Sequence, residues 1–267
     1  MGKTRILITG GTGSIGRELA KLAFTDLPTS HITIFSRNEK DQVLMKKEYP
    51  LYDYVIGDIR DYQKVYDVCR GKDYVFHLAA LKHVNICEEQ PQEAIKSNVL
   101  GSMNVINACK EHGCKMINMS SDKAIAPSNV YGMTKYLANK MVEEAGYVSI
   151  ISGNVLWTSG SVLPIWGEQI KGGVINLTSE KMTRFFVSPR SLASFMLANM
   201  DSTGVCVVPM EAFKMYDIAQ EFIKRYGNGS EKINITGLRP GERLHEFRDE
   251  STSSETNICT DLSYIFL

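Results

Sequence analysis

Two pairs of side chains in the segment SSDKAIAPSNVYGMTK have the types and spacing that proton transfer requires. Tyr131 and Lys135 are four residues apart, so they lie on one face of a helix. An ammonium beside a phenol favours the phenolate, and we therefore expect Lys135 to make Tyr131 a base near neutral pH. Such a base removes a hydroxyl proton while hydride leaves the same carbon. Ser121 is expected to hold that hydroxyl.

Asp122 and Lys123 supply a second acid and a second base that oxidation alone does not require. An acid and a base that act on neighbouring carbons benefit from fixed adjacent positions. Two plainer interpretations remain open at this point. Asp122 would cap a helix beside a surface lysine, and Tyr131 and Lys135 would be an ordinary surface pair.

A glycine-rich turn, GGTGSIG at residues 10–16, precedes a predicted helix and follows an apolar strand. In this context the glycines permit a tight turn, close approach of a pyrophosphate and close helix–strand packing, with phosphates at the helix N-terminus. The sequence therefore predicts dinucleotide binding, with contacts from Gly10, Gly13, Ser14, Ile15 and Gly16.

The end of the second predicted strand indicates which dinucleotide binds. An NAD site places Asp or Glu there for the ribose 2′-hydroxyl, whereas this chain has Ser36 and Arg37. Arg37 would pair with a 2′-phosphate and Ser36 would donate to it, so we expect NADP rather than NAD. The alternative is a solvated surface arginine.

The ends of the third and fourth strands complete the predicted cofactor site. Asp58 is expected to accept from the adenine amine, and Ile59 to pack on the ring. Leu78, Ala79 and Ala80 are small or apolar residues that would let the cofactor lie against the backbone.

Strand and helix patterns alternate through the first half of the chain. Predicted strands span residues 5–9, 31–36, 54–57, 74–79, 115–120 and 148–155, and predicted helices span 17–24, 61–70, 91–111 and 128–145. This alternation is typical of an α/β fold with a Rossmann-like, doubly wound parallel sheet, in which ligands bind at the carboxyl ends of the strands. In the long helix, the spacing of Ile95, Val99, Met103 and Ile106 predicts one apolar face.

Glycines and Pro164 interrupt the alternation after residue 156, although residues 191–200 and 216–226 retain helical patterns. We expect a cofactor domain at 1–156, to which 188–208 returns, and a smaller substrate-binding lobe at 157–267.

The composition is that of an ordinary globular protein. Of 267 residues, 43% are hydrophobic and 22% charged, and 30 basic residues balance 30 acidic ones. This balance gives no indication of nucleic-acid binding, and no apolar run is long enough to span a membrane. The six cysteines lack metal-binding spacing, so we expect reduced thiols, no metal site and a cytoplasmic protein.

The motifs together resemble the extended short-chain dehydrogenases/reductases. GDIRD, HLAALKHVNICEEQPQEAIKSNVLGSMNVI, SSDKAIAPSNVYGMTK, GNV, MTRFF and GLRPGERLHE narrow the resemblance to the UDP-N-acetylglucosamine 4,6-dehydratase family of polysaccharide biosynthesis. It covers the chain from about Ile6 to Glu246. It implies a UDP-sugar substrate and a homo-oligomer.

The resemblance also implies roles for individual residues. Tyr131, supported by Lys135 and Ser121, takes the 4-hydroxyl proton as hydride passes to NADP⁺. Lys123 removes the C5 proton, Asp122 protonates the departing 6-hydroxyl, and hydride returns to C6. Members that retain configuration at C5 tend to carry Met in place of Tyr131, so this chain is similar to the inverting members.

Polar residues near the family motifs are expected to hold the substrate. Arg184 and Arg239 are the expected diphosphate partners. Lys82, Asn154 and Glu242 are expected polar contacts. The chain departs from the family at residues 151–153 (ISG), between Lys135 and the sixth strand, and in the 157–161 loop, which bears on the identity of the sugar.

Two other functions use the same motifs. A nucleotide-sugar 4-epimerase or ketoreductase would use Tyr131 without the Asp122 and Lys123 pair. A non-catalytic NADPH-binding regulator would bind the cofactor without turnover, although such proteins often lack the Tyr and Lys that this chain retains.

Overall fold

The structure, a computed structural model, describes residues 3–27 and 29–266. Its centre is a seven-stranded parallel sheet in the order β10-β6-β5-β4-β1-β2-β3. The strands are β1 (Arg5–Thr9), β2 (His31–Ser36), β3 (Asp53–Ile56), β4 (Tyr74–His77), β5 (Lys115–Met119), β6 (Val148–Ile151) and β10 (Gly204–Val207). The predicted Rossmann-like sheet is confirmed.

Helices cover both faces of this sheet because its strands are apolar on both sides. They are α1 (Ser14–Asp26), α2 (Glu39–Glu48), α3 (Tyr62–Cys69), α4 (Val84–Glu89), α5 (Pro91–Ala94), α6 (Gly101–His112), α7 (Val130–Glu144) and α9 (Pro189–Ala198). One core joins α1 and α9 to the sheet, and a second core joins α3, α6 and α7 to the opposite face.

The predicted long helix at 91–111 is interrupted by a π-helical segment, η1 (Ile95–Leu100), between α5 and α6. The wider turn changes the helical phase, so the predicted apolar face is not continuous. Ile106 is buried, whereas Ile95 and Met103 are 45% and 40% exposed. The predicted apolar face is therefore interrupted, and only part of it is buried.

The chain leaves the main sheet between Ser152 and Gly153. Residues 148–155, predicted as one strand, form β6 and then β7 (Asn154–Val155), which pairs with β9 in a second sheet. A side chain at Gly153 would lie 2.7 Å from the Phe185 carbonyl oxygen, so the crossing requires glycine.

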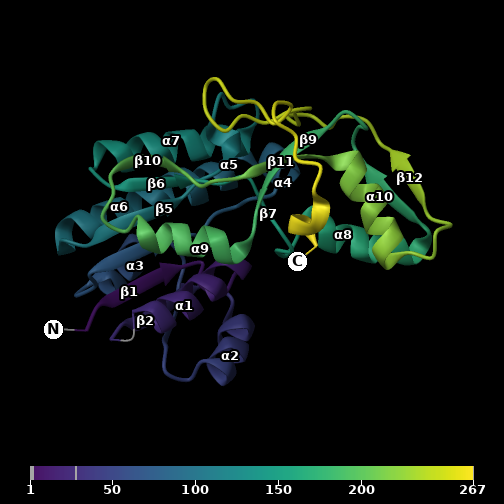
Figure 1. The fold of residues 1–267 in the computed structure, drawn as a ribbon. Coiled ribbons are helices and arrows are strands. Elements are labelled where there is room, and N and C mark those ends of the chain that lie inside the picture. The colour runs from purple at the N-terminus through teal and green to yellow at the C-terminus, as the bar shows by residue number, and fades with distance from the viewer. Residues whose placement is uncertain (1–2, 28, 267) are drawn as a thin grey trace.

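The smaller lobe has its own apolar core, which includes Trp166, Phe213 and Phe222. It contains α8 (Val162–Gln169), β8 (Val174–Leu177), β9 (Thr183–Val187), β11 (Glu211–Lys214), α10 (Met215–Tyr226) and β12 (Lys232–Ile235). Figure 1 shows β12, α8 and α10 beside the main sheet, while β10 returns to that sheet. Among the described residues, no helix is both long and apolar enough to cross a membrane.

Candidate functional site

A cavity of about 1060 Å³ lies where the carboxyl ends of the parallel strands face the smaller lobe. The strand order reverses between β1 and β4, which is where doubly wound sheets bind ligands. The cavity is lined by all the residues that the sequence assigned to the cofactor: Gly10, Gly13, Ser14, Ile15, Gly16, Ser36, Arg37, Asp58, Ile59, Leu78, Ala79, Ala80, Tyr131 and Lys135.

In the glycine-rich turn, the positions of Gly10 and Gly16 leave no space for a side chain. Gly10 has φ of +67°, and a Cβ atom there would lie 2.9 Å from the backbone nitrogen of Ala79. A Cβ atom on Gly16 would lie 2.6 Å from the Cα atom of Gly11. The backbone therefore forms an open cradle in front of α1, whose first turn has no side-chain cap. This geometry fits a pyrophosphate.

Arg37 stands at the rim of the cradle with its side chain 60% exposed and its Nη1 atom 3.8 Å from Asp58 Oδ2. Ser36 Oγ accepts a hydrogen bond from Gln42 at 3.0 Å. Burial opposes ionisation of Asp58, but hydrogen bonds and charge from Arg60, with a smaller effect of Arg37, lower its pKa overall. Arg37 is thus loosely held and accessible to an anion.

The turn η2 (Asp122–Ala124) follows β5 and carries the predicted acid/base pair. Asp122 is fully buried, and its Oδ1 atom accepts from Ser121 Oγ at 2.9 Å and from Lys123 Nζ at 3.0 Å. The residue that caps this turn is Ser121 rather than Asp122. A capping aspartate beside a surface lysine is therefore excluded.

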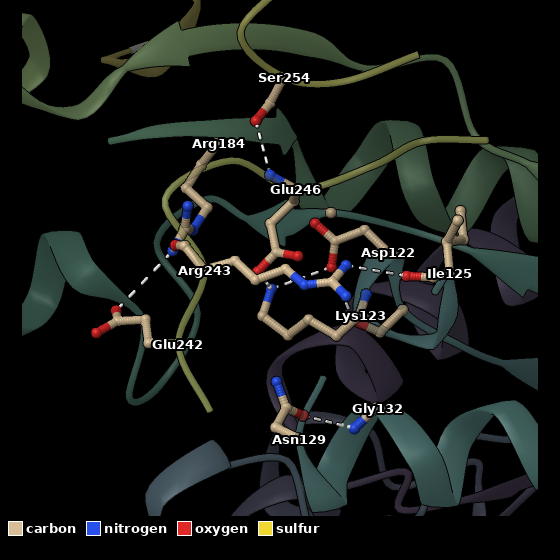
Figure 2. Close-up of polar contacts among 12 residues, drawn as sticks. Asp122, Lys123, Ile125, Asn129, Gly132, Arg184, Glu242, Arg243, Glu246 and Ser254 are labelled. Atoms are coloured by element: carbon tan, nitrogen blue, oxygen red, sulfur yellow. Dashed lines mark hydrogen bonds and ion pairs between the residues drawn. The ribbon is translucent and has the colours of Figure 1, made fainter. Parts of the chain in front are cut away.

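Lys123 lines the cavity between two carboxylates, as Figure 2 shows. Its Nζ atom lies 3.0 Å from Asp122 Oδ1 and 3.5 Å from Glu246 Oε1. Burial alone would lower the pKa of Lys123, but the charges of Asp122 and Glu246 raise it overall. Lys123 is therefore an ammonium ion at neutral pH. Asp122 lies behind it, and among residues 3–27 and 29–266 its Oδ2 atom has no hydrogen-bond partner.

Tyr131 and Lys135 both line the cavity from the first turns of α7. The helix start is fixed by Asn129, whose side chain accepts from the backbone nitrogen of Gly132 at 2.7 Å. Lys135 is 4% exposed and donates to the carbonyl oxygen of Met119 at 2.5 Å. A plain surface pair is therefore excluded.

The expected acidification of Tyr131 is not found. Burial raises the pKa of Tyr131, and the opposing effects of Ser121 and Lys123 do not compensate. Burial also lowers the pKa of Lys135 to about 8. Sequence spacing placed the two side chains on one helix but gave no measure of burial, which dominates here.

Gly132 explains how Tyr131 and Lys123 come to lie at the same cavity. A side chain at Gly132 would overlap the carbonyl oxygen of Lys123. The absence of a Cβ atom therefore lets the start of α7 pack directly on η2.

The predicted substrate residues Lys82, Asn154, Arg184, Arg239 and Glu242 also line the cavity. Burial lowers the pKa of Lys82, whose Nζ atom donates to the carbonyl oxygen of Ser159 at 2.5 Å. Glu242 accepts from Thr178 at 3.3 Å, and Arg239 is exposed at the rim.

Arg184 is 6% exposed and is held by backbone carbonyl groups. Its Nη1 atom donates to Thr183 at 2.7 Å and Leu244 at 3.0 Å, and its Nη2 atom donates to Arg243 at 2.8 Å. It therefore ties the 243–244 segment to β9, in addition to lining the cavity.

Sequence reasoning missed two residues of the site. Asn98, in η1, bonds both backbone groups of Leu81 at 2.8 and 2.9 Å and also Thr134, so it fixes the loop after β4 against α7. Glu246 is the second carboxylate at Lys123. Both residues lie in the motifs that carry the family resemblance, KSNVLGS and GLRPGERLHE, and only the fold shows what their side chains contact.

Comparison with known proteins agrees with this geometry. Residues 6–265 match the family described as polysaccharide biosynthesis protein. A UDP-N-acetylglucosamine 4,6-dehydratase (inverting) of Campylobacter jejuni is 37% identical, over 94% of this chain and 79% of that protein. A UDP-glucose 4-epimerase of Rickettsia akari is 36% identical, over 90% of this chain and 76% of that protein.

A solved structure, Pen from Bacillus thuringiensis, superimposes with a TM-score of 0.89 at 33% identity, covering 93% of this chain and 81% of that one. The cradle, the side chains gathered at the cavity and these similarities agree. The chain therefore belongs to the polysaccharide biosynthesis protein family of extended short-chain dehydrogenases/reductases.

Proposed function

We propose that the protein is a cytoplasmic, NADP-dependent UDP-N-acetylglucosamine 4,6-dehydratase that inverts configuration at C5. The observation that carries this proposal is that Lys123 and Tyr131 line one cavity with a dinucleotide cradle, and that Lys123 is backed by the buried Asp122 at 3.0 Å. Oxidation or epimerisation at C4 alone does not require that pair. The Campylobacter jejuni dehydratase, which is named as inverting, supports the substrate and the stereochemistry.

The cofactor would be held by the glycine-rich turn at its pyrophosphate and by Arg37 and Ser36 at a 2′-phosphate. Asp58 and Ile59 would bracket the adenine, and residues 78–80 would face the nicotinamide half. When bound, the cofactor accepts hydride from the sugar and returns it. The exposed guanidinium of Arg37 supports NADP rather than NAD.

Three side chains transfer protons and two others assist them. Tyr131 receives the proton of the sugar 4-hydroxyl, which Ser121 orients, and Lys135 supports Tyr131 from the next turn of α7. Lys123 Nζ removes the C5 proton, because it is the cavity-lining amine that is hydrogen-bonded to Asp122. Asp122 supplies the proton to the departing 6-hydroxyl, so that water leaves and C5 and C6 become joined by a double bond.

The remaining cavity residues would bind the nucleotide sugar. We assign Arg184 and Arg239 to the diphosphate, and Lys82, Asn154 and Glu242 to polar groups of the substrate. In this assignment residues 1–156 with 188–208 bind the cofactor, and residues 157–267 bind the substrate.

Self-association is part of the proposal. Apolar side chains on η1, α6 and α7 are 40–50% exposed, among them Leu100, Met103, Met133 and Leu137. A homo-oligomer would cover them. Light scattering should show a mass above one chain, and Leu137→Glu together with Met133→Glu should reduce it.

Incubation with UDP-N-acetylglucosamine and catalytic NADP⁺, followed by mass spectrometry, tests the activity. Loss of one water supports dehydration. The second candidate is a 4-epimerase, which the Rickettsia akari relative favours and which gives a product of unchanged mass. NADPH binding without turnover of any UDP-sugar would instead indicate a regulator.

A further inference from the structure

Glu246 is a buried carboxylate at the cavity, and none of the proposed reaction steps assigns it a role. It is 3% exposed, lines the cavity and lies with Oε1 3.5 Å from Lys123 Nζ. Figure 2 shows Glu246 and Asp122 both directed toward the Lys123 ammonium. Among the described residues, Lys123 is the only cation paired with the Glu246 side chain.

The backbone around Glu246 is fixed from several directions. Its nitrogen donates to Ser254 Oγ at 2.9 Å, and its carbonyl oxygen accepts from the Ser254 nitrogen at 2.8 Å. Ser254 Oγ also bonds Thr183 Oγ1 at 2.8 Å, which joins the segment to β9. Arg184 holds residues 243 and 244 to the same strand. These hydrogen bonds fix the backbone that places the Glu246 carboxylate beside Lys123.

Four charged or titratable groups face Lys123. Asp122 lies on its own turn, Glu246 on the segment after Leu244, Arg184 on β9 and Tyr131 on α7. Arg184 opposes the positive charge on Lys123, and Asp122 and Glu246 favour it. Asp122 also accepts from Ser121, and Arg184 is itself paired with Glu242 at 3.9 Å, so Glu246 adds a second negative charge at Lys123.

The proton shared by Asp122 and Lys123 must change position during the proposed reaction. At rest, the proton lies on Lys123 Nζ, which donates it to Asp122 Oδ1 at 3.0 Å. Elimination needs the same single proton on Asp122, so that Lys123 Nζ bonds the C5 proton while the Asp122 proton bonds O6. One transfer along the 3.0 Å hydrogen bond converts the first state into the second, and the elimination itself restores the first. The elimination therefore ends with a positive charge regenerated on Lys123. To complete the turnover, C5 takes a proton from solvent as hydride reaches C6, and the proton held by Tyr131 returns to solvent.

We infer that Glu246 is a positioning residue for Lys123, which holds the amine at the cavity wall and stabilises the positive charge that Nζ acquires when it takes the C5 proton. This inference rests on the proposed dehydratase function. It assigns Glu246 a role through Lys123 rather than through contact with the sugar.

The test compares Glu246→Gln with the wild type, because the amide keeps the shape and removes the charge. NMR of isotope-labelled lysine, assigned with Lys123→Gln, reports the Lys123 titration without any substrate. The pKa of Lys123 should fall by about one to three units, as expected for losing an opposite charge at this distance. Glu246→Asp keeps the negative charge but moves it away from Lys123 by one methylene group. The pKa of Lys123 in this variant should be intermediate.

The same variants are then assayed for dehydration across pH. Activity requires one proton on the Asp122 and Lys123 pair, so its alkaline limb reports the loss of that proton. In Glu246→Gln this limb should move to lower pH by the amount that NMR shows. Glu255→Gln, which removes an exposed carboxylate paired with His245, is the matched control and should move neither readout.

The outcomes separate the inference from the proposed function. A Lys123 titration unchanged in folded Glu246→Gln overturns the inference, as does an unchanged alkaline limb. A shifted titration in a protein that removes no water from any UDP-sugar supports the charge relationship and refutes the dehydratase proposal. Thermal melting of both Glu246 variants verifies that they remain folded.

Discussion

Lys123 Nζ donates a 3.0 Å hydrogen bond to Oδ1 of Asp122, an aspartate with no exposed surface. Both residues come from one three-residue turn at the end of β5, so their mutual position is set by local backbone rather than by distant packing. Removing such a charge pair from water costs free energy, and Lys123, its outer member, lines the cavity where we expect the chemistry.

Replacing Lys123 should separate oxidation from water loss. Lys123→Gln keeps a hydrogen-bond donor for Asp122 but has no titratable amine. Dehydration should fall by at least about 100-fold, the usual contribution of an acid/base group. NADPH absorbance should still appear when stoichiometric enzyme meets substrate, because Tyr131 and Lys135 are intact. Lys140→Ala, a surface lysine paired with Glu143, is the control. Full dehydration by Lys123→Gln would refute the assigned role.

Arg37 should determine the preference between NADP and NAD. Arg37→Asp removes the cation and places a carboxylate near Asp58, so NADP binding should weaken more than tenfold relative to NAD binding. Calorimetry with both cofactors measures the two affinities. Arg70→Ala, which removes an exposed arginine paired with Asp67, serves as the control. If Arg37→Asp weakens both cofactors equally, Arg37 does not contact a 2′-phosphate.

The glycine-rich turn should not tolerate a methyl group at its last glycine, Gly16. A Cβ atom on Gly16 would lie 2.6 Å from backbone atoms of Gly11, so Gly16→Ala should destabilise the fold by about 1–3 kcal/mol and weaken cofactor binding. Gly167→Ala lies in α8, where a Cβ atom meets nothing within 4 Å, and should not destabilise. Denaturant melts and cofactor titrations of both variants measure the free energy of unfolding and the cofactor affinity. If the two variants gave equal values, the proposed cradle would be contradicted.

The main sheet could be predicted from sequence because its strands are short apolar runs that alternate with helices. The strands at 5–9 and 31–36 have the predicted bounds. The π-helical segment at Ile95–Leu100 could not be predicted, because its wider turn depends on tertiary contacts such as that of Asn98 with Leu81. The short strands of the smaller lobe pair over long sequence distances, which left no periodic signal to read.

The candidate site, like the fold, could be predicted from the sequence only in part. Fixed spacing made the glycine-rich turn, Tyr131 and Lys135 recognisable in the sequence, because their chemistry requires that spacing. Glu246 reaches Lys123 across more than a hundred residues, so only the fold reveals it. The pKa of Tyr131 was predicted in the wrong direction because burial, which sequence does not report, outweighs its neighbours.

Lys135 should make stability depend on pH. Burial lowers its pKa from 10.5 to about 8 in the folded protein. Between these values the unfolded chain binds more protons, so the wild type gains stability as pH rises from about 8 toward 10.5. The gain is on the order of 3 kcal/mol, and below pH 8 the full penalty is present. Lys135→Met lacks this dependence.

Urea melts of the wild type and Lys135→Met from pH 7 to pH 10 measure the effect as a difference, which cancels the other titrating groups. The stability of the wild type relative to the variant should rise across this range. A difference that stays constant with pH would mean that Lys135 is not a buried ammonium at neutral pH.

The most direct test of the central claim is NMR of the product formed from UDP-N-acetylglucosamine in D₂O with catalytic NADP⁺. The account predicts a 4-keto-6-deoxy sugar that has lost one water, carries deuterium at C5 and has inverted configuration there. A product that retains its 6-hydroxyl and is altered only at C4 would contradict it, because the Asp122 and Lys123 pair would then have no part in the reaction.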